Sequence, residues 1–462
     1  MGPVSVFAMA TLLCLSPLMR GGNRQIALIA LEAIAILFLL GICLRWSMRA
    51  DNAFPDAPDS WHKQWTVALL VWSPAWLAVV YLVPIPADFW AALQGRGIYG
   101  TLMADAAMPV AASLPLSLVP DATKASLLAG MPIAAAFIAG YGARLSQLKL
   151  LLGVAAGMAF LQVLLGLLQA GGGSQSSLYF SVEFGGRPLG TFANTNHFAN
   201  YIGMAVAGYI WLASNSVAWE RGAGGESERF GQRHALAFWI AGGFILILGI
   251  VMSFSRGAAL SGLPAALLAV GVAYFAGGRA TNWRTPVLLT VAVVVAAIVL
   301  VGAGALLSRF DLTRLSTDAS FRSLLASSTL AGAREFWPWG AGWGTYASVY
   351  PRFQPIAVDG HADHAHQDYA QLLFEGGIFA VFLCLAFLAL AIGRLIHLAR
   401  QRIGKGELEP GELAAAVCGV GLLGFLIHSL VEFNMHIPAN AILAALLAGV
   451  FLRPLPASVG SR

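Results

Sequence analysis

Uninterrupted apolar runs, each about as long as a bilayer is thick, recur from one end of this 462-residue chain to the other. A helix needs about 20 apolar residues to cross the hydrocarbon core, where only helices and closed barrels satisfy their own backbone polar groups. Charged residues make up 11% of the chain and hydrophobic residues 58%, so there are too few charges to cover a soluble globule of this size. The sequence therefore predicts an all-α, polytopic transmembrane helical bundle.

Hydropathy predicts about 12 spans, and the lysines and arginines between them predict the orientation. Most basic residues of the short connections fall on one side, so this side and both termini are expected to be cytoplasmic. Residues 85–125, 171–196 and 308–367 would then face outward. The expected spans lie near residues 3–19, 25–44, 65–84, 126–143, 147–170, 197–217, 235–253, 257–277, 286–307, 370–392, 411–435 and 438–452.

The second outward segment ends in GGRPLGTFANTNHFANYIG, residues 185–203. Arg187 supplies a fixed positive charge, and Asn194, Asn196 and His197 supply hydrogen-bond donors and acceptors directly before a helix. Such a loop suits a glycan or a phosphate. The alternative is a helix-entry turn in which Asn194 or Asn196 caps the next span.

Two further arginines lie on the predicted outer side. Arg256, in the short turn SFSRGAAL, is expected at the membrane boundary, where its planar fork matches phosphate oxygens. The alternative is an arginine that reaches lipid headgroups as an anchor. Arg322 lies on the polar side of an amphipathic helix in the long loop, ahead of the tryptophan-rich segment WPWGAGWGTY. Those aromatic residues could stack on sugars or anchor the chain at the interface.

Three histidines end the long loop, in HADHAHQD at residues 361–368. Imidazole gives and takes a proton near neutral pH, which suits acid–base chemistry. The H-x-D-H-x-H spacing could also bind a transition metal, but the sequence offers no closed tetrahedral ligand set, and we predict no metal site. His366 lies closest to the membrane surface and is the preferred reacting group, with Asp363 or Asp368 as an orienting partner or rival base.

These motifs occur in a familiar order. From residue 185 to residue 441, the set GRPLGTFANTNHFANY, SFSRGAAL, WPWGAGWGTY, HAHQDYAQLLFEGG and HSLVEFNMHIPANA resembles the O-antigen ligase and Wzy-type polymerase family of bacterial membrane proteins. The resemblance implies a GT-C type glycosyltransferase of the inner membrane, with its active site on the periplasmic side. Such an enzyme moves a whole glycan from undecaprenyl diphosphate to lipid A core, to another lipid-linked repeat or to a protein. It needs no metal, nucleotide sugar or other cofactor.

The resemblance also implies residue roles. Arg187 and Arg256 correspond to arginines thought to hold the diphosphate, Arg322 is a further arginine at the site, and His366 is the histidine proposed to act on the acceptor hydroxyl. Gln367 stands where the family often has asparagine. Candidate glycan or supporting contacts are Asn194, Asn196, His197, Asp363, Asp368, Tyr369 and Glu375.

The predicted organisation has four parts: N-terminal transmembrane helices (1–170), transmembrane helices with two short substrate-site turns (171–307), a periplasmic loop carrying short helices (308–367) and C-terminal transmembrane helices (368–462). The alternative function is a polytopic transporter or flippase of lipid-linked sugars, which would need ionisable or broken-helix sites near the middle of the membrane. Because the arginines and histidines gather at one face, the enzyme is favoured. No basic-aromatic patch indicates nucleic acid. Ligase, polymerase and protein-glycosylating relatives remain open.

Overall fold

The computed structural model describes residues 1–47, 61–107, 111–180, 186–216, 226–277, 284–302, 304, 312–358 and 360–454. Within these ranges the regular secondary structure is helical except for one antiparallel strand pair, in which β1 (Pro84–Pro86) lies beside β2 (Ser113–Pro115). The all-α prediction is confirmed. Several positions used for orientation, such as Arg49 and Arg221, and the start of the predicted long loop at residues 308–311 lie outside the described residues.

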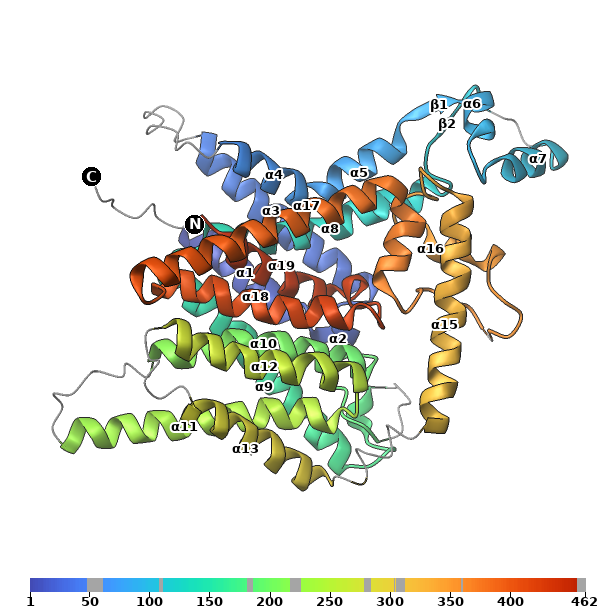
Figure 1. Ribbon diagram of the computed structural model, residues 1–462. Helices are drawn as coiled ribbons and strands as arrows, with labels where there is room; N and C mark the ends of the chain where they lie inside the picture. The colour runs from blue at the N-terminus through green and yellow to red at the C-terminus, as the bar shows by residue number, and fades with distance from the viewer. Residues whose placement is uncertain are drawn as a thin grey trace.

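The helices in chain order form the bundle and the structure at one of its ends (Figure 1). They are α1 (Pro3–Leu15), α2 (Leu18–Gly21), α3 (Gln25–Ser47), α4 (Trp61–Val71), α5 (Ser73–Leu82), α6 (Ala87–Ala92), α7 (Gly97–Asp105), α8 (Pro120–Gly142), α9 (Leu145–Gly171), α10 (Thr195–Ser216), α11 (Glu226–Met252), α12 (Arg256–Ala276), α13 (Arg284–Val301), α15 (Leu312–Glu335), α16 (Tyr346–Val349), α17 (Asp368–Lys405), α18 (Pro410–His428) and α19 (Pro438–Leu452), with short 3-10 turns η1 (Ser177–Tyr179), η4 (Tyr350–Arg352) and η5 (Asn434–His436).

Among the described residues, seven helices are long and apolar enough to cross a membrane: α3, α8, α9, α11, α12, α17 and α18. Shorter apolar helices lie at Pro3–Leu15, Ser73–Leu82, Val287–Val301 and Pro438–Leu452. Every predicted span overlaps at least one helix among the described residues, which supports a multi-pass membrane protein, while the number of crossings stays a prediction.

Two expected spans differ in ways that have a local cause. The segment 65–84 is two helices, α4 and α5, because Pro74 near the start of α5 has no N–H for the turn before it. The segment 411–435 ends as helix at His428. The residues that follow, 429–437, form an irregular connection to α19 whose carbonyl groups accept hydrogen bonds from outside the helix, including one from the Asp368 N–H to the Ser429 carbonyl at 3.0 Å.

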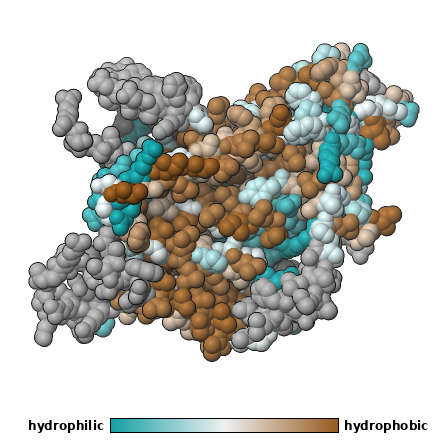
Figure 2. Space-filling view, viewed as in Figure 1, coloured by the Kyte–Doolittle hydropathy of each residue, from teal (hydrophilic) through white to brown (hydrophobic). Residues whose placement is uncertain are grey.

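The bundle packs through small residues and presents apolar side chains outward. Helices α8 and α19 approach each other closely at Gly140 and Gly449 because neither residue has a side chain. A Cβ at either position would collide with the backbone of the facing helix. Helix α17 exposes Phe382, Leu385 and Leu388 along its length. Figure 2 shows hydrophobic residues over the side of the bundle and hydrophilic residues toward its ends, as a membrane protein requires.

The described parts of the three segments predicted to face outward lie at one end of the bundle, where α15 runs across the ends of the other helices (Figure 1). The N-terminus and the turn between α17 and α18 lie at the other end. A small separate core underlies α15 and includes Leu325, Phe336, Tyr350 and Phe374. Helix α17 bends at Gly377, whose φ of +48° and contact with the Pro338 carbonyl exclude a side chain. We call this end of the molecule the α15 end.

Candidate functional site

A wholly buried carboxylate, Glu432, lies at the centre of the polar residues of the α15 end. One oxygen, Oε1, is 2.9 Å from Nδ1 of His366, and the other, Oε2, is 3.2 Å from Nη2 of Arg322. The side-chain amide of Asn196 also donates to Oε2. These groups come from four separate segments of the chain: α10, α15, the turn before α17 and the connection between α18 and α19.

Its surroundings keep Glu432 ionised. Burial alone raises the pKa of a carboxyl group, but the hydrogen bond from His366 and the charges of His197 and Arg322 hold the pKa of Glu432 well below its usual range. A buried anion bound by one arginine, one amide and one imidazole is therefore the fixed charge on which the cluster is built.

The backbone of His366 is held in an uncommon conformation. Its φ of +51° lies in the left-handed region, which costs a residue other than glycine about 1 to 3 kcal/mol and is concentrated at functional sites. The ring contacts the edge of Phe433 at a centroid distance of 4.7 Å, and its side chain is 30% exposed. With Nδ1 donating to Glu432, Nε2 keeps a lone pair that can accept a proton.

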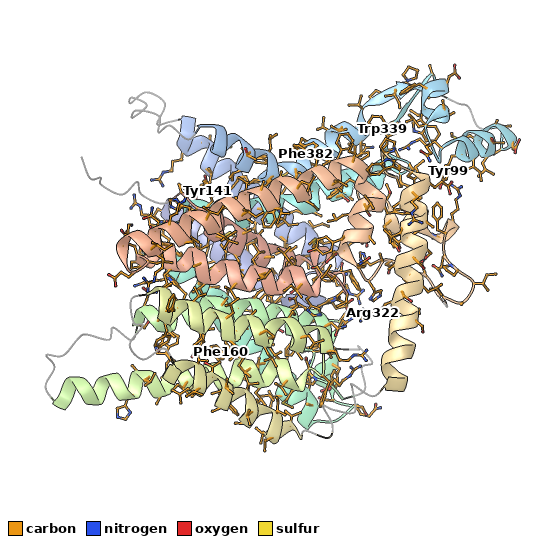
Figure 3. The ribbon with its side chains drawn as sticks, viewed as in Figure 1. Tyr99, Tyr141, Phe160, Arg322, Trp339 and Phe382 are labelled. Carbon is orange, nitrogen blue, oxygen red and sulfur yellow. The ribbon has the colours of Figure 1, made fainter. Side chains whose placement is uncertain are left out.

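Arg322 extends from α15 toward the ends of α18 and α19 (Figure 3). Besides Glu432, it donates to the backbone carbonyl of Val431. Two of its five N–H groups are thus taken by the protein, and its side chain remains 34% exposed. The structure brings this predicted arginine to His366 through the carboxylate that they share.

Arg256 begins α12, at the same end of the bundle. The preceding Phe254 has a left-handed φ of +52°, and the Ser255 hydroxyl accepts a hydrogen bond from the Ala258 N–H at 3.3 Å, which caps the helix. The adjacent Gly257 has no room for a Cβ because the His428 ring lies against it. The start of α12 therefore lies beside the end of α18, where the connection carrying Glu432 begins.

Arg187 lies in the described part of the segment before α10. A buried amide of α9 holds this segment in place: Gln169 Oε1 accepts hydrogen bonds from the N–H groups of Leu189, at 3.0 Å, and Gly190, at 2.9 Å. This segment, between α9 and α10, and the start of α12 both lie at the α15 end (Figure 1).

The two asparagines of this segment have different roles: one caps α10, and the other contacts the buried carboxylate. Asn194 Oδ1 accepts a hydrogen bond from the Asn196 N–H at 2.8 Å and so caps α10. The side chain of Asn196 instead reaches Glu432. His197 is buried, with Nε2 4.0 Å from Glu432 Oε1 and its ring against the edge of Phe433 at 4.6 Å.

Neither aspartate predicted to orient His366 does so. Asp363 is largely exposed and pairs with His361 Nε2 at 3.3 Å. Asp368 is wholly buried and binds His436 Nδ1 at 2.9 Å. The orienting carboxylate is Glu432, because the connection between α18 and α19 folds back over the start of α17.

Tyr369 and Glu375 support the architecture around the site. The Tyr369 hydroxyl donates to the Leu426 carbonyl at 2.9 Å. The carboxylate of Glu375 accepts hydrogen bonds from the N–H groups of Gly344 and Tyr346, each at 3.0 Å. The two hydrogen bonds to Glu375 fix the tryptophan-rich segment against α17.

The same segment is also held by Arg96, from the first outward region, and by Tyr81 of α5. Arg96 is fully buried and donates to the carbonyls of Leu116, at 2.7 Å, and Gly340, at 3.0 Å. The Tyr81 hydroxyl donates to the Trp339 carbonyl at 2.7 Å. Buried polar contacts therefore explain the conformation of the WPWGAGWGTY segment.

Sequence reasoning missed Glu432 and His436 because both fell within or just after a span predicted to continue to residue 435. One signal was available: Glu432, Asn434 and His436 are three polar residues within five positions, at the end of an apolar run. Such a cluster is costly inside a bilayer, so it indicates a break in the span. In the residues that the structure describes, no group of three His, Cys, Asp or Glu side chains is arranged to hold a metal ion.

The fold and the cluster define a class of protein: a polytopic helical membrane protein with a buried carboxylate that joins histidine and arginine at one end of the bundle. Residues 241–385 match the family model described as O-antigen ligase. This match supports the resemblance of the chain to the O-antigen ligase and Wzy-type family over these residues. The matched part contains Arg256, Arg322 and His366 but ends before Glu432. No curated protein matches the chain.

Proposed function

We propose that this protein is an inner-membrane glycosyltransferase that moves a glycan as one unit from an undecaprenyl diphosphate carrier to an acceptor hydroxyl. The observation that carries the proposal is the bond between His366 and the buried Glu432, which lies beside Arg322 at one end of the bundle. The family match supports the same class of reaction. The acceptor is lipid A core in a ligase, or a second lipid-linked repeat in a polymerase.

The reaction needs charge stabilisation at the leaving group. When the diphosphate departs from the anomeric carbon, negative charge grows on its oxygens, and one well-placed donor lowers the barrier by about 3 to 4 kcal/mol. In this proposal Arg187 and Arg256 hold the diphosphate, and Arg322 adds positive charge next to Glu432. Because arginines carry this charge, the proposal requires no metal.

The acceptor hydroxyl must lose its proton as it attacks. His366 takes this proton at Nε2, while Nδ1 continues to donate to Glu432, whose negative charge stabilises the imidazolium that forms. A general base of this kind accelerates proton removal by about 10² to 10⁴. The hydroxyl oxygen forms the new bond to the anomeric carbon, and the electron pair of the old bond leaves with the diphosphate.

The α15 end is assigned to the periplasm in this proposal, with both termini in the cytoplasm. A cysteine introduced at Ser348 should react with an impermeant thiol reagent in whole cells, whereas one at Lys405 should not. The reverse pattern would place the site on the cytoplasmic face and remove the periplasmic reaction.

Deletion of the gene followed by a lipopolysaccharide gel tests the reaction itself. Loss of all long chains on lipid A identifies a ligase, and retention of a single repeat identifies a polymerase. The purified protein in liposomes should then transfer glycan from its undecaprenyl diphosphate carrier. Movement of the carrier between leaflets without transfer would instead identify a flippase.

A further inference from the structure

A second acid–histidine pair lies beside the first. Asp368, the first residue of α17, is wholly buried, and its Oδ1 accepts a hydrogen bond from His436 Nδ1 at 2.9 Å. The other oxygen, Oδ2, accepts one from the Met435 N–H at 3.0 Å. The side chain of His436 is 23% exposed, and with Nδ1 directed to Asp368 its Nε2 can hydrogen-bond a ligand.

The two pairs are built crosswise from the same two segments. The start of α17 supplies His366 and Asp368, and the connection between α18 and α19 supplies Glu432 and His436. Each segment therefore contributes one histidine and the carboxylate that orients the other histidine. Movement of either segment would disturb both pairs at once.

Half-buried rings connect the two pairs. The Phe433 ring meets the edge of His366 at 4.7 Å and stacks on His364 at 4.5 Å, and His364 lies 5.0 Å from His436. Burial and the neighbouring charge of His436 lower the pKa of His364 to about 3, so this ring is neutral at ordinary pH. Ring contacts thus run without a break from His366 to His436, and a pyranose packs its apolar face against aromatic side chains of this kind.

The two histidines differ in the charged group beyond their carboxylate partner. His366 shares Glu432 with Arg322, whereas the charged groups that act on His436 are the carboxylates Asp368 and Glu375. Burial alone lowers the pKa of His436, but the hydrogen bond to Asp368 and the negative charges of both carboxylates raise it above its ordinary value. The two carboxylates repel a diphosphate and do not repel a neutral hydroxyl.

We infer that Phe433, His364 and His436 form the subsite for the acceptor sugar, in which His436 Nε2 hydrogen-bonds a hydroxyl other than the attacking one. The inference rests on the proposed function. It adds that the acceptor approaches from one particular side of His366. The diphosphate lies on the arginine side of His366. The acceptor attacks from the face of the donor sugar opposite to the leaving group and so lies on the His436 side.

His436→Asn is the decisive variant, because its amide still donates to Asp368 while Nε2 and the ring are lost. The assay uses purified protein in liposomes, undecaprenyl diphosphate-linked glycan from the host, and lipid A–core from the deletion strain at increasing concentration. We expect the KM for lipid A–core to rise about tenfold or more, because one to two favourable contacts are lost. The kcat should stay within about threefold of the parent value. His436→Gln, which keeps a polar group near Nε2, should recover part of the affinity.

His361→Asn is the matched control, since His361 is exposed and pairs only with Asp363 among the described contacts. Its KM and kcat should equal those of the parent. An unchanged KM in His436→Asn, or a fall in kcat alone, would overturn the acceptor subsite and leave the transferase intact.

Binding separates this inference from the proposed function. Deacylated core oligosaccharide should bind the parent protein in saturation-transfer NMR, and its signal should weaken in His436→Asn but not in His361→Asn. If the parent shows this pattern without any transfer, the proposed reaction fails and the sugar subsite stands. If the parent binds no core or repeat glycan, the subsite is refuted.

Discussion

Two buried glutamates at the α15 end have opposite kinds of partner. Glu432 is bound by side chains, from His366, Arg322 and Asn196, whereas Glu375 is bound by the backbone N–H groups of Gly344 and Tyr346 and by a glutamine. Both carboxylates are almost inaccessible to solvent. The two glutamates therefore do not differ in burial. They differ in the groups that bind them.

The difference shows how one end of a bundle holds a reactive cluster in place. Glu375 satisfies donors that cannot move without unfolding the tryptophan-rich segment, so its role is to fix the backbone. Glu432 holds groups that remain partly exposed, at 30% for His366 and 34% for Arg322, so its charge acts at a surface that a substrate can reach. The following predictions test this division.

The largest effect is expected for His366→Asn. Asparagine tolerates the left-handed φ of +51°, so the fold is retained, but it cannot take a proton. Transfer should fall by about 10² to 10⁴ in a radiolabelled-glycan assay, with carrier binding preserved because, in the proposed reaction, the arginines hold the diphosphate. Loss of carrier binding with normal turnover at saturation would make His366 a phosphate ligand instead of the base.

Glu432→Gln should come next. Glutamine keeps the shape of the side chain but loses the charge that orients His366 and stabilises its protonated form. Loss of a supporting partner of this kind lowers activity by about 10- to 100-fold. Since the folded pKa of Glu432 lies below the unfolded one, the parent gains stability from this carboxylate above the unfolded pKa of about 4.3 and loses it as pH falls. Thermal unfolding in detergent should show this acid-side loss in the parent and less of it in the variant.

Arg256→Lys should reduce transfer by roughly tenfold or more, almost as much as Arg256→Ala, because a point charge replaces a planar fork poorly at a diphosphate. Lysine would still reach lipid headgroups. Full activity of the lysine variant at normal expression would therefore identify Arg256 as a membrane anchor. The measurement is initial rate against carrier concentration in liposomes.

Glu375→Gln should affect stability more than catalysis. One glutamine oxygen cannot replace two carboxylate oxygens toward both Gly344 and Tyr346, and an unsatisfied buried donor costs about 1 to 3 kcal/mol. The melting temperature should fall, while transfer per folded molecule stays within a few fold of the parent. A catalytic loss as large as that of Glu432→Gln would contradict the division between the two glutamates.

Asp363→Asn should have the smallest effect. Asp363 is exposed, its partner His361 is exposed, and surface ion pairs of this kind contribute about 0 to 1 kcal/mol. Transfer rate and melting temperature should both match the parent. A clear loss of transfer would return Asp363 to the list of bases considered from the sequence.

Much of the architecture follows from composition and periodicity. Long apolar runs with few charges require helices in a membrane, and every expected span overlaps a helix. The gathering of Arg187, Arg256, Arg322 and the histidines at one end also follows, because alternating spans place alternate connections on the same side. The helix-forming tendency and the cost of charge in lipid act locally along the chain, so the sequence alone determines them.

Which carboxylate binds which histidine was decided by tertiary structure. Asp363 and Asp368 are near His366 in sequence, yet Glu432, 66 positions later, makes the bond. The end of α18 at His428 exposes a connection whose carbonyls accept the Asp368 N–H, and this pairing brings Glu432 to His366 and His436 to Asp368. Hydrogen bonds of this kind join segments that only the packed bundle brings together, and no local pattern of residues specifies them.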